Sequence, residues 1–372
     1  MKNITFVIQK LGVGGVQKNV DFLATKLFND GYNINVISLS PSVKNTDFNT
    51  KGLNLTINSK GLKRFKLFRF IQKIQFLRTT LKNDDSELFI TFNVYDAIIT
   101  LLSKRRRDVP LLCSERTAPS KVSRKIKFLS KVVYNSSSGV VFQTEDAKNY
   151  FSHKISKKGI IIHNPYIPKK SLEQSDHIAF ENRKNIVVSA VARFEHRKGI
   201  DILLKGFALF LEKHHDYKLL IFGDYYKSKR YKDLARKLKI ENKVFFMGYR
   251  SNVSWEMRDS KIFVLPSRVE GIPNILLEFL AQGVPTVSSD CPSGGTKLLT
   301  NNSDRGLLFR NEDYIDLAKK MVYLVENPVF SEKLSIKAIE VKDVYNEKDI
   351  YNKWKNYIDK IIDRAKNEKS NK

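Results

Sequence analysis

Short apolar runs alternate with amphipathic stretches along the first 165 residues of the chain. The apolar runs predict strands at 4–8, 33–39, 53–57, 87–92, 110–114, 139–144 and 159–164. The stretches between them predict helices at 16–28, 63–82, 95–103, 121–134 and 145–151. Because strands that alternate with helices form a parallel sheet covered on both faces, we interpret residues 1–165 as one Rossmann-like, doubly wound domain.

The same alternation returns in the second half of the chain. Strands are predicted at 185–192, 217–223, 243–249, 261–267, 284–289 and 306–309, and helices at 199–214, 228–239, 252–259, 273–282 and 312–326. Residues 185–345 are therefore interpreted as a second Rossmann-like domain. The polar stretch 166–184 is expected to be an exposed link. Residues 346–372 are expected to be a C-terminal helix and tail whose polar end, from Ala365, is frayed.

The predicted fold class is therefore α/β, with two doubly wound domains facing a cleft. In open parallel sheets, ligands bind outside the carboxyl ends of the strands, so residues that follow strands are the first candidates for a site. A chain of 372 residues with 42% apolar residues can build two cores. Cys113 and Cys291 match no metal or redox spacing, which favours a reducing cytosol. The N-terminus does not have the pattern of a signal peptide, and no apolar run approaches the roughly 18 residues needed to span a bilayer.

The charge of the chain is strongly positive and unevenly spread. The formal net charge is +27, and residues 1–175 hold 30 Lys/Arg against 12 Asp/Glu, which gives +18 for the first half alone. An anionic partner is therefore expected to meet the first half. Charge alone leaves nucleic acid, an anionic membrane and phosphorylated substrates open as that partner.

Residues 60–82 hold eight Lys/Arg and no acidic residue, interleaved with Leu, Ile and Phe. A basic amphipathic helix of this kind can lie on an anionic membrane surface, or it can simply cover the sheet with a basic outer side. The further basic clusters at 104–107 and 121–131 favour the membrane. The candidate membrane residues are Lys63, Arg64, Lys66, Arg69 and Lys73.

Three segments that follow predicted strands contain candidate chemistry. The first is the glycine turn at 12–15, where backbone N–H groups can approach a phosphate. The second, at 191–201, places Arg193 and Lys198 near a helix N-terminus, where two cations suit a diphosphate. The third, at 270–283, puts Glu270 before a helix in which Pro273 suits the first turn. Asn274 and Glu278 are four residues apart and share one side of that helix.

Through these three segments, the chain resembles the retaining GT-B glycosyltransferases of family 4. The resemblance rests on Gly14-Gly15, on Ala192-Arg193 with Arg197-Lys198-Gly199-Ile200-Asp201, on Glu270-Gly-Ile-Pro-Asn-Ile-Leu-Leu-Glu278 and on the continuation Gly283 to Gly294. It is strong in the second domain and diffuse in the first. The continuation is similar to members that build bacterial lipopolysaccharide and capsule.

The resemblance implies a role for each matching residue. Arg193 and Lys198 would hold the donor diphosphate and stabilise the departing nucleotide, and Glu270 would lie beside the donor sugar. Glu115 and Arg116 are tentative contacts to the acceptor or the sugar. The implied donor-binding residues are Gly14, Gly15, Gly248, Tyr249, Arg250, Gly271, Ile272, Pro273, Asn274, Ile275 and Glu278.

The chain also departs from the family pattern. Many similar proteins carry a histidine near 114–119, and this chain has none there, so a general-base role for Glu115 or Arg116 is in doubt. Ile272 replaces a frequent aromatic residue. The loop 223–225 lacks a second glycine that is often present.

The resemblance implies transfer of a hexose or N-acetylhexosamine from a nucleotide diphosphate sugar, with UDP favoured, to a lipid-linked or polysaccharide acceptor of surface polysaccharide synthesis. The expected location is cytoplasmic, peripherally associated with the anionic inner membrane surface. No metal ion, cofactor or nucleic-acid partner is expected. Two alternatives stay open: a nucleotide-sugar epimerase of similar fold, and a basic nucleic-acid-binding protein, although no recognition motif supports the latter.

Overall fold

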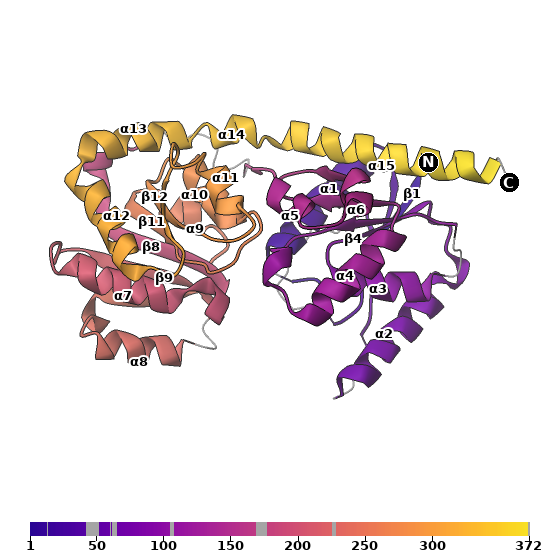
Figure 1. The fold of residues 1–372 in the computed structure, drawn as a ribbon, viewed down its shortest axis with the longest axis horizontal. Coiled ribbons are helices and arrows are strands. Elements are labelled where there is room, and N and C mark those ends of the chain that lie inside the picture. Colours follow the sequence, from indigo (N-terminus) through magenta and orange to yellow (C-terminus); the bar gives the residue numbers. More distant parts are fainter. Residues whose placement is uncertain are drawn as a thin grey trace. The chain divides into compact units, whose positions relative to one another are not determined.

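The computed structural model describes residues 1–12, 14–41, 52–59, 61, 65–104, 108–168, 177–224 and 228–370. The chain divides into two compact units. The first unit consists of Met1–Asn164 together with Lys348–Lys372, and the second unit is Pro165–Glu347. Figure 1 shows both units, and each is described by itself below.

A seven-stranded parallel sheet forms the centre of the first unit. Its strand order is β3-β2-β1-β4-β5-β6-β7. Most of these strands are buried continuously, as expected when helices cover both faces of a parallel sheet. The strands are β1 (Asn3–Ile8), β2 (Asn33–Ser38), β3 (Asn54–Ile57), β4 (Leu88–Thr91), β5 (Leu111–Ser114), β6 (Gly139–Phe142) and β7 (Gly159–Ile161).

Two hydrophobic clusters hold the helices of the first unit on opposite faces of this sheet. One cluster joins the sheet to α1 (Gly15–Asn29) and to the C-terminal helix α15 (Glu347–Ser370). The other joins the sheet to the remaining helices, which are α2 (Lys66–Thr80), α3 (Val94–Ser103), α4 (Arg124–Ser136), α5 (Glu145–Asn149) and α6 (His153–Lys157). Within that second layer, α3 packs against both α2 and α4.

The second unit is built around a six-stranded parallel sheet with the order β10-β9-β8-β11-β12-β13. Its strands are β8 (Lys184–Arg193), β9 (Lys218–Asp224), β10 (Val244–Gly248), β11 (Ser260–Leu265), β12 (Thr286–Asp290) and β13 (Leu307–Arg310). Its helices are α7 (Ile200–Leu211), α8 (Lys229–Lys237), α9 (Val253–Glu256), α10 (Asn274–Ala281), α11 (Gly295–Leu299), α12 (Tyr314–Glu326), α13 (Pro328–Ala338) and α14 (Val341–Val344).

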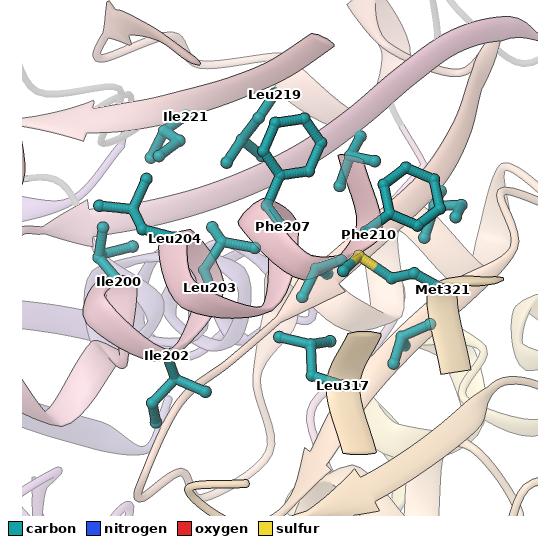
Figure 2. Close-up of a cluster of buried hydrophobic side chains, with 14 of the residues drawn as sticks. Ile200, Ile202, Leu203, Leu204, Phe207, Phe210, Leu219, Ile221, Leu317 and Met321 are labelled. Atoms are coloured by element: carbon teal, nitrogen blue, oxygen red, sulfur yellow. The ribbon is translucent and has the colours of Figure 1, made fainter. Parts of the chain in front are cut away.

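A large apolar cluster fixes α7 against the second sheet. Figure 2 shows Ile200, Leu204 and Phe207 of α7 close to the side chains of β9, with Leu317 and Met321 of α12 on the other side. On the opposite face, α10 packs through a separate cluster that includes a stacked pair of rings, Phe263 and Phe279, 3.9 Å apart. Because both helices are anchored over their whole length, the loops that precede them are held in place as well.

The prediction of two doubly wound parallel sheets is confirmed, with several local corrections. The helices α6 and α11 were not predicted from the sequence. Phe180 and Arg183 are buried, so the described end of the stretch expected to be an exposed link packs onto the second unit. α15 continues to Ser370, although fraying was expected from Ala365. The predicted cleft stays a prediction.

The strand orders mark one special position in each sheet. The order reverses between β1 and β4 in the first unit and between β8 and β11 in the second. Loops that leave neighbouring strands in opposite directions open a crevice at such a point, where open α/β sheets bind their ligands. No helix in the described ranges has the length and apolar character needed to cross a membrane.

Candidate active site

Two loops meet at the reversal point of the second sheet. One follows β8 and contains Lys198 in a short 3₁₀ turn (His196–Lys198), and the other follows β11 and leads to Glu270. Gly199, between the 3₁₀ turn and α7, has φ 67° and would place a Cβ 1.9 Å from the carbonyl oxygen of Pro266. Only glycine therefore lets the two loops come this close.

Lys198 and Glu270 form a closely held ion pair at this point. The Nζ of Lys198 lies 2.5 Å from Oε1 of Glu270, and the hydroxyl of Ser267 donates to the same oxygen at 2.7 Å. Burial alone would raise the pKa of Glu270, but the charge and hydrogen bond of Lys198 outweigh it and hold that pKa below its ordinary value. Glu270 is thus an anion whose partner is one of the two cations predicted to hold phosphate.

Arg268 ties the two loops together. Its backbone N–H donates to the carbonyl of Arg197 at 2.8 Å, and its guanidinium donates to both carboxylate oxygens of Asp201, at 2.9 and 2.6 Å. The hydrogen bonds from Arg268 to Asp201 raise the pKa of the guanidinium. This bidentate pair spans from the loop after β11 to the first turn of α7, so it fixes the spacing between Lys198 and Glu270. Arg268 was not predicted as a site residue from the sequence.

The segment after Glu270 packs against the start of α11. A Cβ on Gly295 would lie 1.7 Å from the carbonyl oxygen of Gly271, so the backbone at 271 rests directly on the start of α11. Gly271, Ile272 and Pro273 are buried, whereas Asn274, Ile275 and Glu278 are half-buried on α10. Pro273 caps α10 with an extended backbone and is not in its first turn, which corrects the expectation. Its carbonyl accepts from the N–H groups of Leu276 and Leu277.

The remaining predicted donor residues of this unit lie farther out. Arg193 ends β8 with its side chain 64% exposed, and its Nε is 3.3 Å from Oε1 of Glu195. Gly248 ends β10, and Tyr249 and Arg250 follow it; β9 separates β10 from β8. Tyr249 and Arg250 are exposed. The structure thus brings Lys198 and Glu270 together, and Arg193 stands at the solvent-facing edge of the same strand ends.

Residues predicted in the first unit follow its strands. Gly14 and Gly15 lead from β1 into α1, at the reversal point of that sheet. Glu115, directly after β5, is buried, and its two carboxylate oxygens accept from Thr117 and from the hydroxyl of Tyr134. Burial raises the pKa of Glu115. Both carboxylate oxygens of Glu115 thus accept hydrogen bonds within the protein, whereas only one nitrogen of the neighbouring Arg116 guanidinium has a hydrogen-bond partner among the described residues.

The predicted membrane residues of α2 do not share one environment. Lys63 and Arg64 lie outside the described residues. Lys66 is exposed and Arg69 is half-buried. Lys73 is 7% exposed, and burial, which outweighs the nearby charge of Asp96, lowers its pKa. Lys73 therefore faces the protein interior and is wrongly assigned to a membrane-facing surface.

Within the described ranges, no group of three or more His, Cys, Asp or Glu side chains could hold a metal ion. The expectation that the protein works without a metal ion stays a prediction.

Comparisons with known sequences identify the family of the chain. Residues 172–341 match the family described as glycosyl transferases group 1. An uncharacterized glycosyltransferase of Haemophilus influenzae is 30% identical over 219 residues, which cover 58% of this chain and 60% of that protein, less than two thirds of its length. The chain is also 30% identical, over 285 residues, to the Campylobacter jejuni GalNAc-α-(1→4)-GalNAc-α-(1→3)-diNAcBac-PP-undecaprenol α-1,4-N-acetyl-D-galactosaminyltransferase. That match covers 75% of this chain and 74% of the relative.

Solved structures share the fold at low sequence identity. Sucrose-phosphate synthase from Thermosynechococcus elongatus superimposes with a TM-score of 0.82 and 15% identity, over 98% of this chain and 100% of that one. The Anabaena protein HepE, solved with UDP and glucose, gives a TM-score of 0.80 and 16% identity, over 96% and 99% of the two chains. The two parallel-sheet units therefore have the GT-B fold of these glycosyltransferases.

Proposed function

We propose that this chain, which belongs to the glycosyl transferases group 1 family and has the GT-B fold, is a glycosyltransferase of bacterial polysaccharide synthesis. In the proposed reaction it transfers a hexose or N-acetylhexosamine from a UDP-sugar with retention of configuration. The observation that carries the proposal is the buried Lys198–Glu270 pair at the reversal point of the second sheet. The use of UDP is supported by the similar Anabaena structure, which was solved with UDP and glucose.

In the proposed reaction, the second unit stabilises the leaving nucleotide. Negative charge builds on the diphosphate as the bond to the sugar breaks, and fixed cations aimed at that charge lower the barrier. Lys198 is half-buried and its ammonium group is held by Glu270, so it is already oriented, whereas Arg193 reaches the diphosphate from the exposed edge. Glu270 and the first turn of α10 bind the sugar hydroxyls, and Glu278 binds the ribose.

The proposed acceptor is a growing glycan that bears phosphate. The name of the Campylobacter relative specifies a glycan linked to PP-undecaprenol. Other relatives are named for poly(ribitol-phosphate) and poly(glycerol-phosphate) acceptors. A lipid-linked or polysaccharide acceptor of this kind suits the positive first unit. By sequence that unit contains 36 Lys/Arg and 15 Asp/Glu, a net charge of +21 out of +27 for the chain.

The test of the reaction is a donor panel. Purified protein is incubated with UDP-, GDP- and ADP-sugars, and nucleotide release is measured with and without a glycan acceptor. Lys198→Ala should keep the fold and lose turnover by a factor of about 10² or more, because one fixed cation at a developing charge contributes about 3 kcal/mol. Lys237→Ala, on the exposed end of α8, is the control. Normal turnover of Lys198→Ala would refute the assignment, and sugar interconversion without transfer would indicate an epimerase.

Peripheral attachment to an anionic membrane is also proposed, with a different set of contacts from the one that the sequence suggested. Apolar side chains are exposed along α2 and on α4, in the helical layer where α3 packs against both. Phe65 is 69% exposed, Phe68 51% and Phe128 65%. Exposed Lys and Arg residues border them, including Lys66, Arg78, Arg124, Lys125 and Lys131. Aromatic side chains among basic ones are typical of surfaces that insert shallowly into anionic bilayers.

Vesicle co-sedimentation tests the membrane proposal. The protein should bind vesicles that contain anionic lipid, and Phe68→Ser combined with Leu67→Ser should weaken that binding several-fold. Val329→Ser removes an equally exposed apolar side chain, 70% exposed, from the second unit and is the matched control. Equal binding by the α2 variant and the wild type would show that this surface does not contact the membrane.

A further inference from the structure

Arg116 occupies an unusual position at the carboxyl ends of the first sheet. It follows β5, and its guanidinium carbon lies 4.9 Å from the ring centre of Phe92, which follows β4, and 5.6 Å from that of Trp354 in α15. Its NH1 donates to Oδ1 of Asn164, beyond the end of β7, at 2.6 Å. Gln143, after β6, donates to the same oxygen at 2.8 Å. Side chains from three other strand ends and one helix thus fix the plane of this guanidinium.

The other buried donors of the guanidinium have no partner among the described residues. The Nε and NH2 atoms of Arg116 are buried and donate to no acceptor within the part of the chain that the structure describes. The adjacent carboxylate of Glu115 does not accept from these two atoms, and its oxygens accept instead from Thr117 and Tyr134. Burial lowers the pKa of Arg116 to about 9, and the charge of Glu115 opposes that effect only in part. The group remains a cation at neutral pH.

Aromatic stacking explains part of this arrangement. The rings of Phe92 and Trp354 stabilise the positive charge and hold the side chain in one orientation. They offer no acceptor to the Nε and NH2 groups, which point along one edge of the fork. Buried N–H donors in folded proteins nearly always have a hydrogen-bond partner. Two such donors without a protein partner on one cation therefore indicate that a ligand supplies the acceptors. Arg116 is only half-buried and the next residue, Thr117, is exposed, so this strand end borders solvent.

The chemistry of the ligand follows from the donors. Two parallel N–H groups of an arginine match two oxygens of a phosphate or carboxylate, and such forked pairs are among the strongest hydrogen bonds in proteins. The carboxyl ends of an open parallel sheet are also where ligands bind. Since the proposed acceptor bears phosphate, we propose that Arg116 binds a phosphate group of the acceptor through Nε and NH2 and thereby selects phosphate-bearing acceptors. This inference rests on the proposed glycosyltransferase function.

Direct binding tests the site without the need for the natural acceptor. Inorganic pyrophosphate is titrated into the protein by calorimetry in the presence of saturating UDP, so that the nucleotide site is already filled. The wild type should bind one pyrophosphate, and Arg116→Met, which keeps an apolar side chain between the rings, should weaken binding at least tenfold. Arg116→Lys keeps the charge and loses the fork, so it should fall between them. Arg236→Met, on the exposed side of α8, is the control.

Two further probes distinguish the possible sources of the phosphate. Farnesyl diphosphate represents a lipid-linked acceptor, and a short poly(glycerol phosphate) represents a polyol phosphate chain; the source that Arg116 serves should compete with pyrophosphate in the wild type. Nucleotide release from the donor without acceptor is measured for the same variants, and the control Arg236→Met should leave it unchanged.

Several outcomes would overturn the proposal. Equal pyrophosphate binding by the wild type and Arg116→Met, or no binding by either, would show that Arg116 only packs against its rings. Loss of acceptor-free nucleotide release in a folded Arg116→Met protein would place Arg116 on the donor. If Arg116→Met does not fold, as judged by circular dichroism, pyrophosphate binding by Arg116→Lys is compared with binding by the wild type instead. A wild type that releases no nucleotide from any donor but binds pyrophosphate through Arg116 would refute the proposed function and leave the anion site standing.

Discussion

The contact between Gly295 and Gly271 gives the sharpest test of how the site is built. A Cβ at position 295 would lie 1.7 Å from the carbonyl oxygen of Gly271 and 3.1 Å from the Cα of Ile272. Contacts under 3.0 Å essentially never occur for a real Cβ, so in Gly295→Ala either α11 or the backbone at 271 must move by about 1.3 Å. Backbone cannot turn aside as a flexible side chain can. The loop that follows Glu270 is therefore displaced by about 1 Å.

The size of the effect follows from that displacement. Overpacking of this kind costs about 1–3 kcal/mol of stability, which leaves a domain of ordinary stability folded. A misplacement of about 1 Å in a group that positions substrate can cost about 10²-fold in rate, or about 2.7 kcal/mol of activation free energy. We therefore expect Gly295→Ala to be folded, with kcat/KM for the donor reduced about a hundredfold.

A second glycine in a helix of the same unit provides the control. In Gly206→Ala the new Cβ would meet Cδ2 of Leu317 at 2.9 Å and the carbonyl oxygen of Tyr314 at 3.0 Å, so a shift of a few tenths of an ångström suffices. Neither Gly206 nor Gly295 lies in the left-handed region, so alanine suits both backbones. Activity within about threefold of the wild type is expected for Gly206→Ala. Unchanged kcat/KM in Gly295→Ala, or equal losses in both variants, would refute the reasoning.

Two further predictions concern buried charge. Asp201→Asn leaves Arg268, 12% exposed, without its bidentate carboxylate, and should lower the free energy of unfolding by about 2–3 kcal/mol and raise the KM for the donor. Asp233→Asn removes a carboxylate from an exposed pair and should change the free energy of unfolding by under about 0.5 kcal/mol. Urea titration measures the stability of both variants, and initial rates measure their KM. Burial raises the pKa of Asp96 to about 7 from an ordinary 3.8. The folded protein therefore holds this proton more tightly than the unfolded chain does. The resulting stabilisation is fully present below pH 3.8 and is lost as the pH rises through 7. Asp96→Asn should flatten the fall of the urea midpoint between pH 4 and 8, and the exposed Asp85→Asn should not; a wild-type slope in Asp96→Asn would contradict the assignment.

The sequence predicts this fold well because the information is local. Most strands of both sheets are short apolar runs, and a run that is buried on both faces can be recognised without knowledge of the tertiary structure. The helix α11 was missed because its five residues, Gly295–Leu299, are too few to show a helical period. The signal for it was the pair Gly294-Gly295, whose meaning depends on a contact with Gly271 that only the folded chain reveals.

The candidate site shows the same division between local and tertiary information. Lys198 and Glu270 were named from their motifs, and the structure joins them in one ion pair. Arg268 was missed because its function depends on Asp201, 67 residues earlier in the chain. Lys73 was misassigned for a related reason. A helix with basic residues on most sides does not reveal from its sequence which of them faces the sheet, and here the inward one approaches the charge of Asp96.

The two ion pairs of the candidate site also define which contacts the donor must replace. Lys198 is held by Glu270 with both side chains nearly buried, at 13% and 10% exposure, whereas Arg193 is paired with Glu195 in an exposed position. An exposed pair contributes little and exchanges its partner easily, but Lys198 can turn toward a diphosphate only if Glu270 keeps another donor. Ser267 supplies one, because its hydroxyl already donates to the same carboxylate oxygen. The sugar hydroxyls would supply the second. We therefore expect nucleotide without sugar to bind more weakly than the intact donor, since only the intact donor satisfies both members of the pair.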